Sequence, residues 1–149
     1  MRLDDDRVMK LQPQLSLVFN GQCEAAFRLY ERSLGGSIAF MMTWGQSPQA
    51  AEAPPGWETK VYHATLKIGD TAILGNDYPA GQYVSPQGFS IILQVDDPDA
   101  AERIFLDLSV NGKVGMPLQE TFWALRFATW VDQFGVPWSI NCERPVQPA

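Results

Sequence analysis

His63 is the only histidine among the 149 residues, and it is the side chain best suited to proton transfer near neutral pH. It lies in the run 58–68, where alternation places it on the same face as Thr65 and Lys67. If this polar face lines a ligand site, His63 is a candidate catalytic acid or base, with Asp77 as its partner across a short hairpin. The alternative is a structural histidine that hydrogen-bonds within its sheet or packs at an interface.

Few other side chains favour metal or thiol chemistry. A single histidine excludes sites that need two imidazoles, and Cys23 and Cys142 are too few for a four-thiolate zinc site. Cys23 lies near a predicted helix start, which favours a thiolate, but the carboxylate of Glu24 beside it opposes that charge. We therefore expect two free, unreactive thiols in a reducing compartment.

Aromatic residues are more numerous than core packing needs, with five tryptophans, four tyrosines and eight phenylalanines. Flat aromatic walls suit ring-bearing or apolar ligands. Trp44 and Trp123 are the candidate walls of a ligand site, whereas Trp138 precedes Ser139 and is expected on the opposite side of its strand, as a core or dimer contact.

Arg126 stands in an otherwise apolar stretch, so its guanidinium needs a carboxylate partner, either from a ligand or from Asp132. The loop 45–56, rich in Pro, Ala and Gly, has few apolar anchors and is either a lid over the site or a plain connector.

The elements that position these residues follow one pattern twice. The first set comprises a strand at 14–19, a helix at 24–34 and strands at 37–44, 58–68 and 71–74. The second comprises a strand at 88–95, a helix from Pro98 to Asn111–Gly112, and strands at 115–118, 123–131 and 138–142.

Two landmarks support a duplication. Val18 and Val95 are 77 residues apart, as are Gly35 and Gly112. The sequence thus predicts an α+β protein of one domain, 1–149, built from paired βαβββ modules at about 11–78 and 86–143.

Four segments carry a resemblance to a known family: residues 19–30, His63-Ala64 with Leu66 and Gly69, Phe122-Trp123 with Arg126, and residues 132–141. Together they resemble the PhnB-like branch of the vicinal oxygen chelate superfamily, which includes glyoxalase I, ring-cleaving dioxygenases and bleomycin-binding proteins. The resemblance extends from about Leu11 to Glu143, although Ala124 and Ala128 replace glycines that are frequent in the branch. It implies a curved mixed sheet around a cup and a homodimer.

The resemblance also locates the superfamily's usual metal ligands. The corresponding residues here are Leu15 (or Gln14 or Pro13), Leu74 or Gly75 with Asn76 and Asp77 just beyond, Ser90, and Ser139. Divalent cations need carboxylates or imidazoles, so these neutral groups predict that the usual metal is absent. We find no Gly-rich strand-to-helix turn for a nucleoside cofactor, which argues against the methyltransferase activity assigned to many branch members.

Net charge and hydropathy argue against a nucleic-acid-binding, membrane or secreted protein. The formal net charge is −6, which opposes binding to nucleic acid and to anionic membranes. No apolar run reaches the length of a bilayer span, and the first ten residues lack a secretory signal, so we expect a cytoplasmic protein.

Three functions stay open. The first is metal-independent binding of a small aromatic or apolar molecule, without any cofactor, by a set comprising Trp44, His63, Asn76, Ser90, Trp123, Arg126 and Ser139. The second is an enzyme with His63 as acid or base and Arg126 or Asn76 orienting an anionic or carbonyl substrate. The third is a divergent divalent metal site formed by Gln14, His63 and Asp77.

Overall fold

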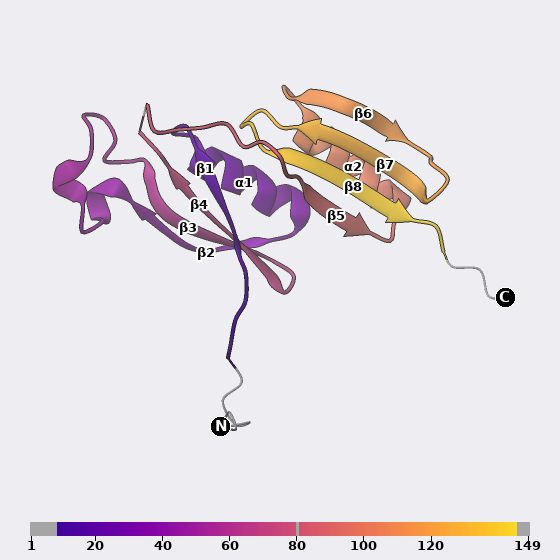
Figure 1. Cartoon of the computed structure of the whole chain (residues 1–149), viewed down its shortest axis with the longest axis horizontal. Helices are drawn as coiled ribbons and strands as arrows, with labels where there is room; N and C mark the ends of the chain where they lie inside the picture. Colours follow the sequence, from indigo (N-terminus) through magenta and orange to yellow (C-terminus); the bar gives the residue numbers. More distant parts are fainter. Residues whose placement is uncertain (1–8, 80, 146–149) are drawn as a thin grey trace, which may run out of the picture.

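The computed structural model describes residues 9–79 and 81–145 as two modules of identical topology (Figure 1). Module 1 comprises β1 (Leu15–Phe19), α1 (Cys23–Leu34), β2 (Ser37–Thr43), β3 (Val61–Ile68) and β4 (Thr71–Asp77). Module 2 comprises β5 (Ile91–Val95), α2 (Pro98–Ser109), β6 (Lys113–Gln119), β7 (Ala124–Val131) and β8 (Pro137–Glu143). The predicted α+β class with paired βαβββ modules is confirmed.

Each module has a four-stranded mixed sheet. The strand orders are β1-β4-β3-β2 and β5-β8-β7-β6, and the first pair in each is parallel while the others are antiparallel. β4 runs three residues beyond the predicted 71–74, because all five residues of β1 pair with its stretch from Ile73 to Asp77. This long-range pairing is not visible in local alternation, and it adds Asn76 and Asp77 to the sheet.

The helices form where the sequence predicts them and cover one face of each sheet. α1 buries Ala26, Phe27 and Tyr30 and ends at Gly35, whose positive φ of 68° suits glycine. α2 starts after Asp97, whose side chain accepts a hydrogen bond from the Asp99 amide. Gly75 of β4 allows α1 to approach closely, since a Cβ there would lie 2.5 Å from the Phe27 ring.

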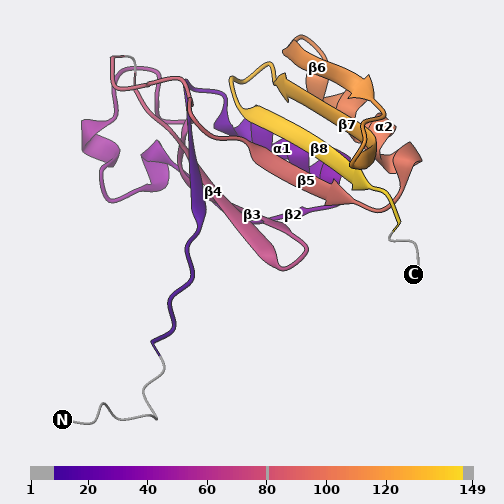
Figure 2. The same ribbon diagram turned by 45° about the vertical axis from the view of Figure 1, so that its right-hand side comes forward.

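The helix-covered sides of the two sheets face each other and share one core. Tyr30 of α1 packs edge-on against Trp138 of β8, with ring centroids 5.0 Å apart. The helices are also linked by polar contacts: Ser33 Oγ lies 3.0 Å from an Asp107 carboxylate oxygen, and Arg103 donates to the Ser33 carbonyl at 3.0 Å. Figure 2 shows α1 lying behind β5 and β8, on the helix side of the second sheet.

This packing determines where a cup can form. Because the helix-covered sides point inward to a common core, the two helix-free faces of the sheets point outward and away from each other. A cup needs two such faces opposite one another. The described part of one copy therefore provides two half-cups rather than a closed cup.

Asp132, at the turn between β7 and β8, is the polar centre of the shared core. Its carboxylate accepts hydrogen bonds from the Tyr30 hydroxyl and from Trp138 Nε1, the latter at 2.9 Å. It also accepts from the amides of Phe134 and Val136, at 2.8 and 3.0 Å. Burial, together with the nearby Asp132 charge, raises the pKa of Tyr30 well above its usual value, so the phenol stays a donor.

Removing this carboxylate should destabilise the protein strongly. Asp132→Ala is expected to lower the free energy of unfolding by about 3 kcal/mol or more, because it leaves buried donors of both modules without an acceptor. Urea unfolding followed by circular dichroism measures the change. Asp70→Ala, in an exposed hairpin turn, is the control and should stay within about 0.5 kcal/mol of the parent. A loss for Asp132→Ala no larger than that control would contradict the role assigned to the carboxylate.

Candidate functional site

The helix-free face of module 1 carries a pocket of about 420 Å³. Trp44, His63 and Asn76, which the sequence analysis grouped as ligand residues, all line it. The remaining lining residues are Gln49, Tyr62, Tyr78, Pro79 and Gln82. Their positions follow from strand register: Ala64 is paired with Gly75, so His63 and Asn76 are neighbours on the opposite face from α1.

His63 is half-buried in this pocket. Its ring centroid lies 5.8 Å from that of Phe40 on β2, and Asn76 is its neighbour on β4. Among the described residues it has neither an ion-pair partner nor a side-chain hydrogen bond. The imidazole is therefore available to a ligand, but it has no carboxylate beside it to act as an acid–base partner.

Asp77 was expected beside His63, and this expectation is wrong. Asp77 is 1% exposed and lies on the helix side of β4. Its two carboxylate oxygens accept from the amides of Cys23 and Val61, at 2.9 and 2.8 Å. Asp77 thus caps the start of α1 from a strand that is distant in the sequence. Its side chain faces the helix because residues 76 and 77 point to opposite faces of the sheet, and Asn76 takes the helix-free one.

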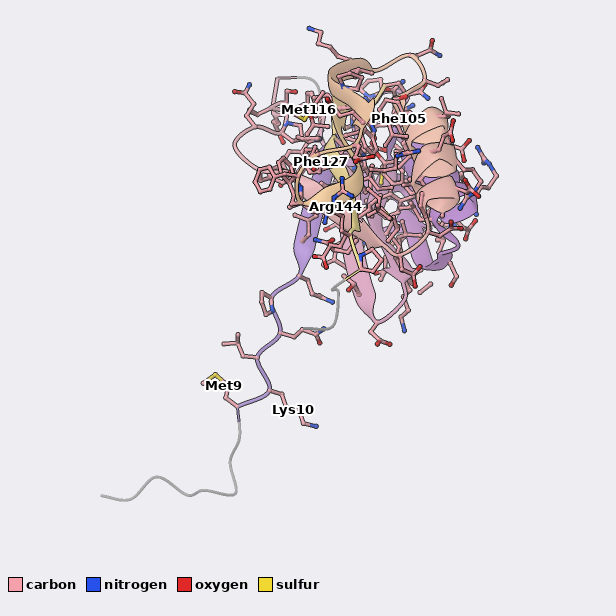
Figure 3. The ribbon with its side chains drawn as sticks, turned by 90° about the vertical axis from the view of Figure 1, so that its right-hand side faces the viewer. Met9, Lys10, Phe105, Met116, Phe127 and Arg144 are labelled. Carbon is pink, nitrogen blue, oxygen red and sulfur yellow. The ribbon has the colours of Figure 1, made fainter. Side chains whose placement is uncertain are left out.

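The helix-free face of module 2 carries hydroxyl and amide groups. Ser90 and Ser139 lie in a shallow pocket of about 340 Å³, with their hydroxyl oxygens 3.4 Å apart. Further along β8, the Asn141 amide donates to Oε1 of Gln94, its partner on β5, at 2.9 Å. Phe127 pairs with Asn141 across β7 and β8, and Figure 3 shows it on the side away from α2 and Phe105.

Trp123 and Arg126 do not share one surface. Trp123 packs against Phe127, with ring centroids 5.3 Å apart, at the rim of the module 2 face. Arg126 pairs with Cys142, on the helix side of the sheet, and donates to the Leu125 carbonyl at 2.7 Å. The expected partnership of Arg126 with Asp132 is also wrong, since that carboxylate is occupied by Tyr30 and Trp138. Trp138 is 1% exposed and belongs to the core, as expected.

The loop 45–56 contains two short helical turns, η1 (Trp44–Gln46) and η2 (Ala50–Glu52). Thr43 and Gln46 exchange hydrogen bonds, and the Ser47 hydroxyl donates to the Trp44 carbonyl at 2.7 Å. The loop adds Gln49 to the pocket of module 1. A lid function for it stays a prediction.

The side chains at the superfamily's metal positions do not fit a divalent ion. Alternation turns Leu15 toward the core and leaves Ser16 and Val18 on the helix-free face of β1. The corresponding residues on β4, β5 and β8 are Leu74 and Asn76, Ser90 and Ile92, and Ser139 and Asn141. These are neutral groups, and no cluster of three His, Cys, Asp or Glu side chains occurs within the described ranges 9–79 and 81–145.

The divergent site of Gln14, His63 and Asp77 is wrong. Asp77 faces α1, whereas His63 faces outward, so the two side chains cannot reach one ion.

Comparison with known proteins identifies the family of this chain. A family model described as 3-demethylubiquinone-9 3-methyltransferase matches residues 11–141. The chain belongs to this family. Protein YjdN of Escherichia coli (strain K12) is 35% identical over 149 residues, which is 93% of this chain and all of YjdN. The resemblance to the PhnB-like branch is thereby confirmed.

Solved structures agree with this membership. Protein PA1353 from Pseudomonas aeruginosa is 42% identical with a TM-score of 0.82, covering 91% of this chain and all of that one. A PhnB protein from Bacillus cereus, described as a putative 3-demethylubiquinone-9 3-methyltransferase, gives 0.77 at 20% identity, over 89% and 99% of the chains. A glyoxalase/bleomycin resistance/dioxygenase family enzyme from Burkholderia phytofirmans PsJN gives 0.59 at 14%, over 88% and 97%, which shows the shared fold.

The family's description includes a methyl transfer, which needs a methyl donor such as a nucleoside cofactor. Residues 20–22 contain one glycine, and residues 96–97 are two aspartates. Such cofactor sites use a Gly-rich turn that lets the backbone approach the ligand. Neither turn in this family member fits that requirement.

Both thiols should be inert in the folded protein. Cys23 and Cys142 are fully buried, and burial raises the pKa of each above its usual value; the charge of Asp77 adds to this effect at Cys23. We expect no reaction with Ellman's reagent at pH 8 until urea unfolds the chain, while Leu106→Cys, on an exposed site of α2, should react at once. Rapid labelling of the native parent would contradict this.

The raised pKa values of Cys23 and Cys142 make the stability of the folded protein depend on pH. Because the folded-state pKa values lie above the unfolded ones, the unfolding free energy should fall as pH rises above about 8.5. Urea unfolding at pH 7.5 and pH 9.5 measures it.

Proposed function

We propose that this family member binds a small organic molecule in a cup formed by two copies of the chain. The helix-free face of module 1 from one copy provides one wall, and the helix-free face of module 2 from the other copy provides the opposite wall. The observation that carries the proposal is the outward direction of both pocket-bearing faces, which follows from the shared core of the helix sides. Within residues 9–79 and 81–145, no segment of the same chain closes either face.

The strand edges support this pairing. The outer strands β2 and β6 have irregular registers, and β6 contains Pro117, features that hinder pairing with another strand. β1 and β5, at the other edges, keep a continuous register with their neighbours. Ile92 of β5 is 56% exposed. We infer that β1 of one copy lies beside β5 of the other, so that the two half-cups meet at their regular edges.

The lining chemistry favours an uncharged or weakly anionic ligand with an aromatic ring. Trp44 and Tyr62 provide flat walls on one side, and Phe127 and Trp123 provide them on the other. His63, Asn76, Ser90 and Ser139 offer hydrogen bonds without a fixed negative charge. Binding rather than acid–base catalysis is the better supported role of His63, since Asp77 is engaged elsewhere.

Native mass spectrometry of protein purified without chelator or affinity metal tests subunit number and metal content together. We expect a dimer mass without bound metal, because the donors at the metal positions are neutral. A retained organic mass would identify the first ligand to examine. A monomer, or a dimer with one divalent ion per subunit, would contradict the proposal.

Mixed dimers test whether the cup is shared. Trp44→Ala damages the module 1 wall and Phe127→Ala damages the module 2 wall, so each homodimer should bind the aromatic dye 8-anilinonaphthalene-1-sulfonate about tenfold more weakly. A dimer with one chain of each variant, purified by two different tags, keeps one cup with two intact walls. Dye titration should recover one site of parental affinity.

Two controls accompany the titration. Leu106→Ala, on the exposed side of α2, should leave dye binding unchanged, and circular dichroism should show that each variant is folded. If mixed dimers recover no site, the cup does not combine walls of two chains.

A further inference from the structure

Residues 9–14 form an extended arm that leaves the body of the molecule just before β1 (Figure 3). Met9 and Leu11 alternate with polar residues along it and are 76% and 73% exposed. Lys10, between them, forms no ion pair with another described residue. The arm thus presents two exposed apolar side chains and one positive charge that no ion pair with another described residue neutralises.

A groove of complementary character lies in module 2. It occupies about 780 Å³ where β5 leads into α2 beside the end of β8, and its apolar lining includes Val95, Ala100 and Pro145. Asp96 and Glu143 give it negative charge and form no ion pair within the described part of the chain. Arg144, also in the groove, is engaged by Glu120.

We propose that the arm of one copy lies in this groove of a second copy, and the proposal rests on the shared cup described above. β1 and β5 hold equivalent edge positions in two modules of the same topology. An edge-to-edge contact between module 1 of one copy and module 2 of the other, about a local two-fold axis, therefore sets β1 antiparallel to the partner's β5. The residues before Leu15 then run past the residues that follow Val95 of the partner subunit. Figures 1 and 2 show that the arm, before β1, lies apart from the ends of β5 and β8, which line the groove in the other module.

In this arrangement the chemistry of the two surfaces matches. Met9 and Leu11 cover Val95 and Pro145 of the partner subunit, and Lys10 approaches Asp96 and Glu143 of the partner subunit. The apolar contact gives affinity, while the opposite charges fix the direction of the arm. Each dimer would have two such contacts, which lie outside the cup itself.

Disulfide trapping between differently tagged chains tests the contact. One chain carries Leu11→Cys and the other Ala100→Cys, so a mixed disulfide forms only between copies. In the control, Leu106→Cys, further along α2 at an exposed position, replaces Ala100→Cys. Native Cys23 and Cys142 are buried and should not compete. After mild oxidation, the mixed product should exceed the control about tenfold, because docking raises the local thiol concentration.

Charge exchange provides a second, independent measurement. Lys10→Glu should weaken dimerisation about threefold in sedimentation experiments at low salt, and Asp96→Lys with Glu143→Lys in the same chain should restore it.

The outcomes separate the two proposals. A protein that sediments as a monomer overturns both the shared cup and the arm contact. A dimer with trapping no greater than the control, or without any effect of Lys10→Glu, overturns the arm contact alone. One further result would overturn the arm contact alone. If a chain that carries both Leu11→Cys and Ala100→Cys forms its disulfide only within single chains after dilution, the arm does not reach a second copy.

Discussion

The carboxylate of Asp132 holds the two modules in their relative position. It accepts from α1 through Tyr30, from β8 through Trp138, and from two amides of its own turn. A carboxylate with this many donors is satisfied in a buried site, and each donor would be costly to bury alone. Because it ties the helix of module 1 to the sheet of module 2, the helix-covered sides must close on each other.

The position of the exposed polar side chains follows from this packing of the two modules. Once the helix sides are shared, the faces with His63 and Asn76 and with Ser90 and Ser139 both point outward. A protein of this topology can enclose a ligand only by meeting another surface, and the regular edges at β1 and β5 offer the place. In the proposed dimer, association of two copies would also complete the ligand site.

Membership of the family gives the fold but not the reaction, since one scaffold hosts many chemistries. The neutral groups at the metal positions distinguish this chain from the metal-dependent members of the superfamily that its sequence resembles. Its aromatic walls and hydroxyl and amide groups suit recognition of an organic ligand by shape and hydrogen bonding. Asp77, a carboxylate close to that site in sequence, contributes to the stability of α1 instead.

Local pattern in the sequence determined the modules, both helices and the proximity of Trp44, His63 and Asn76, because alternation and a hairpin fix neighbours within a few strands. It also determined the burial of Trp138 next to Ser139. Only the tertiary structure decided the partners of Asp77 and Asp132, the helix-side position of Arg126 and the outward direction of both faces. These depend on contacts between residues far apart in the chain, such as Tyr30 with Asp132, which no local periodicity encodes.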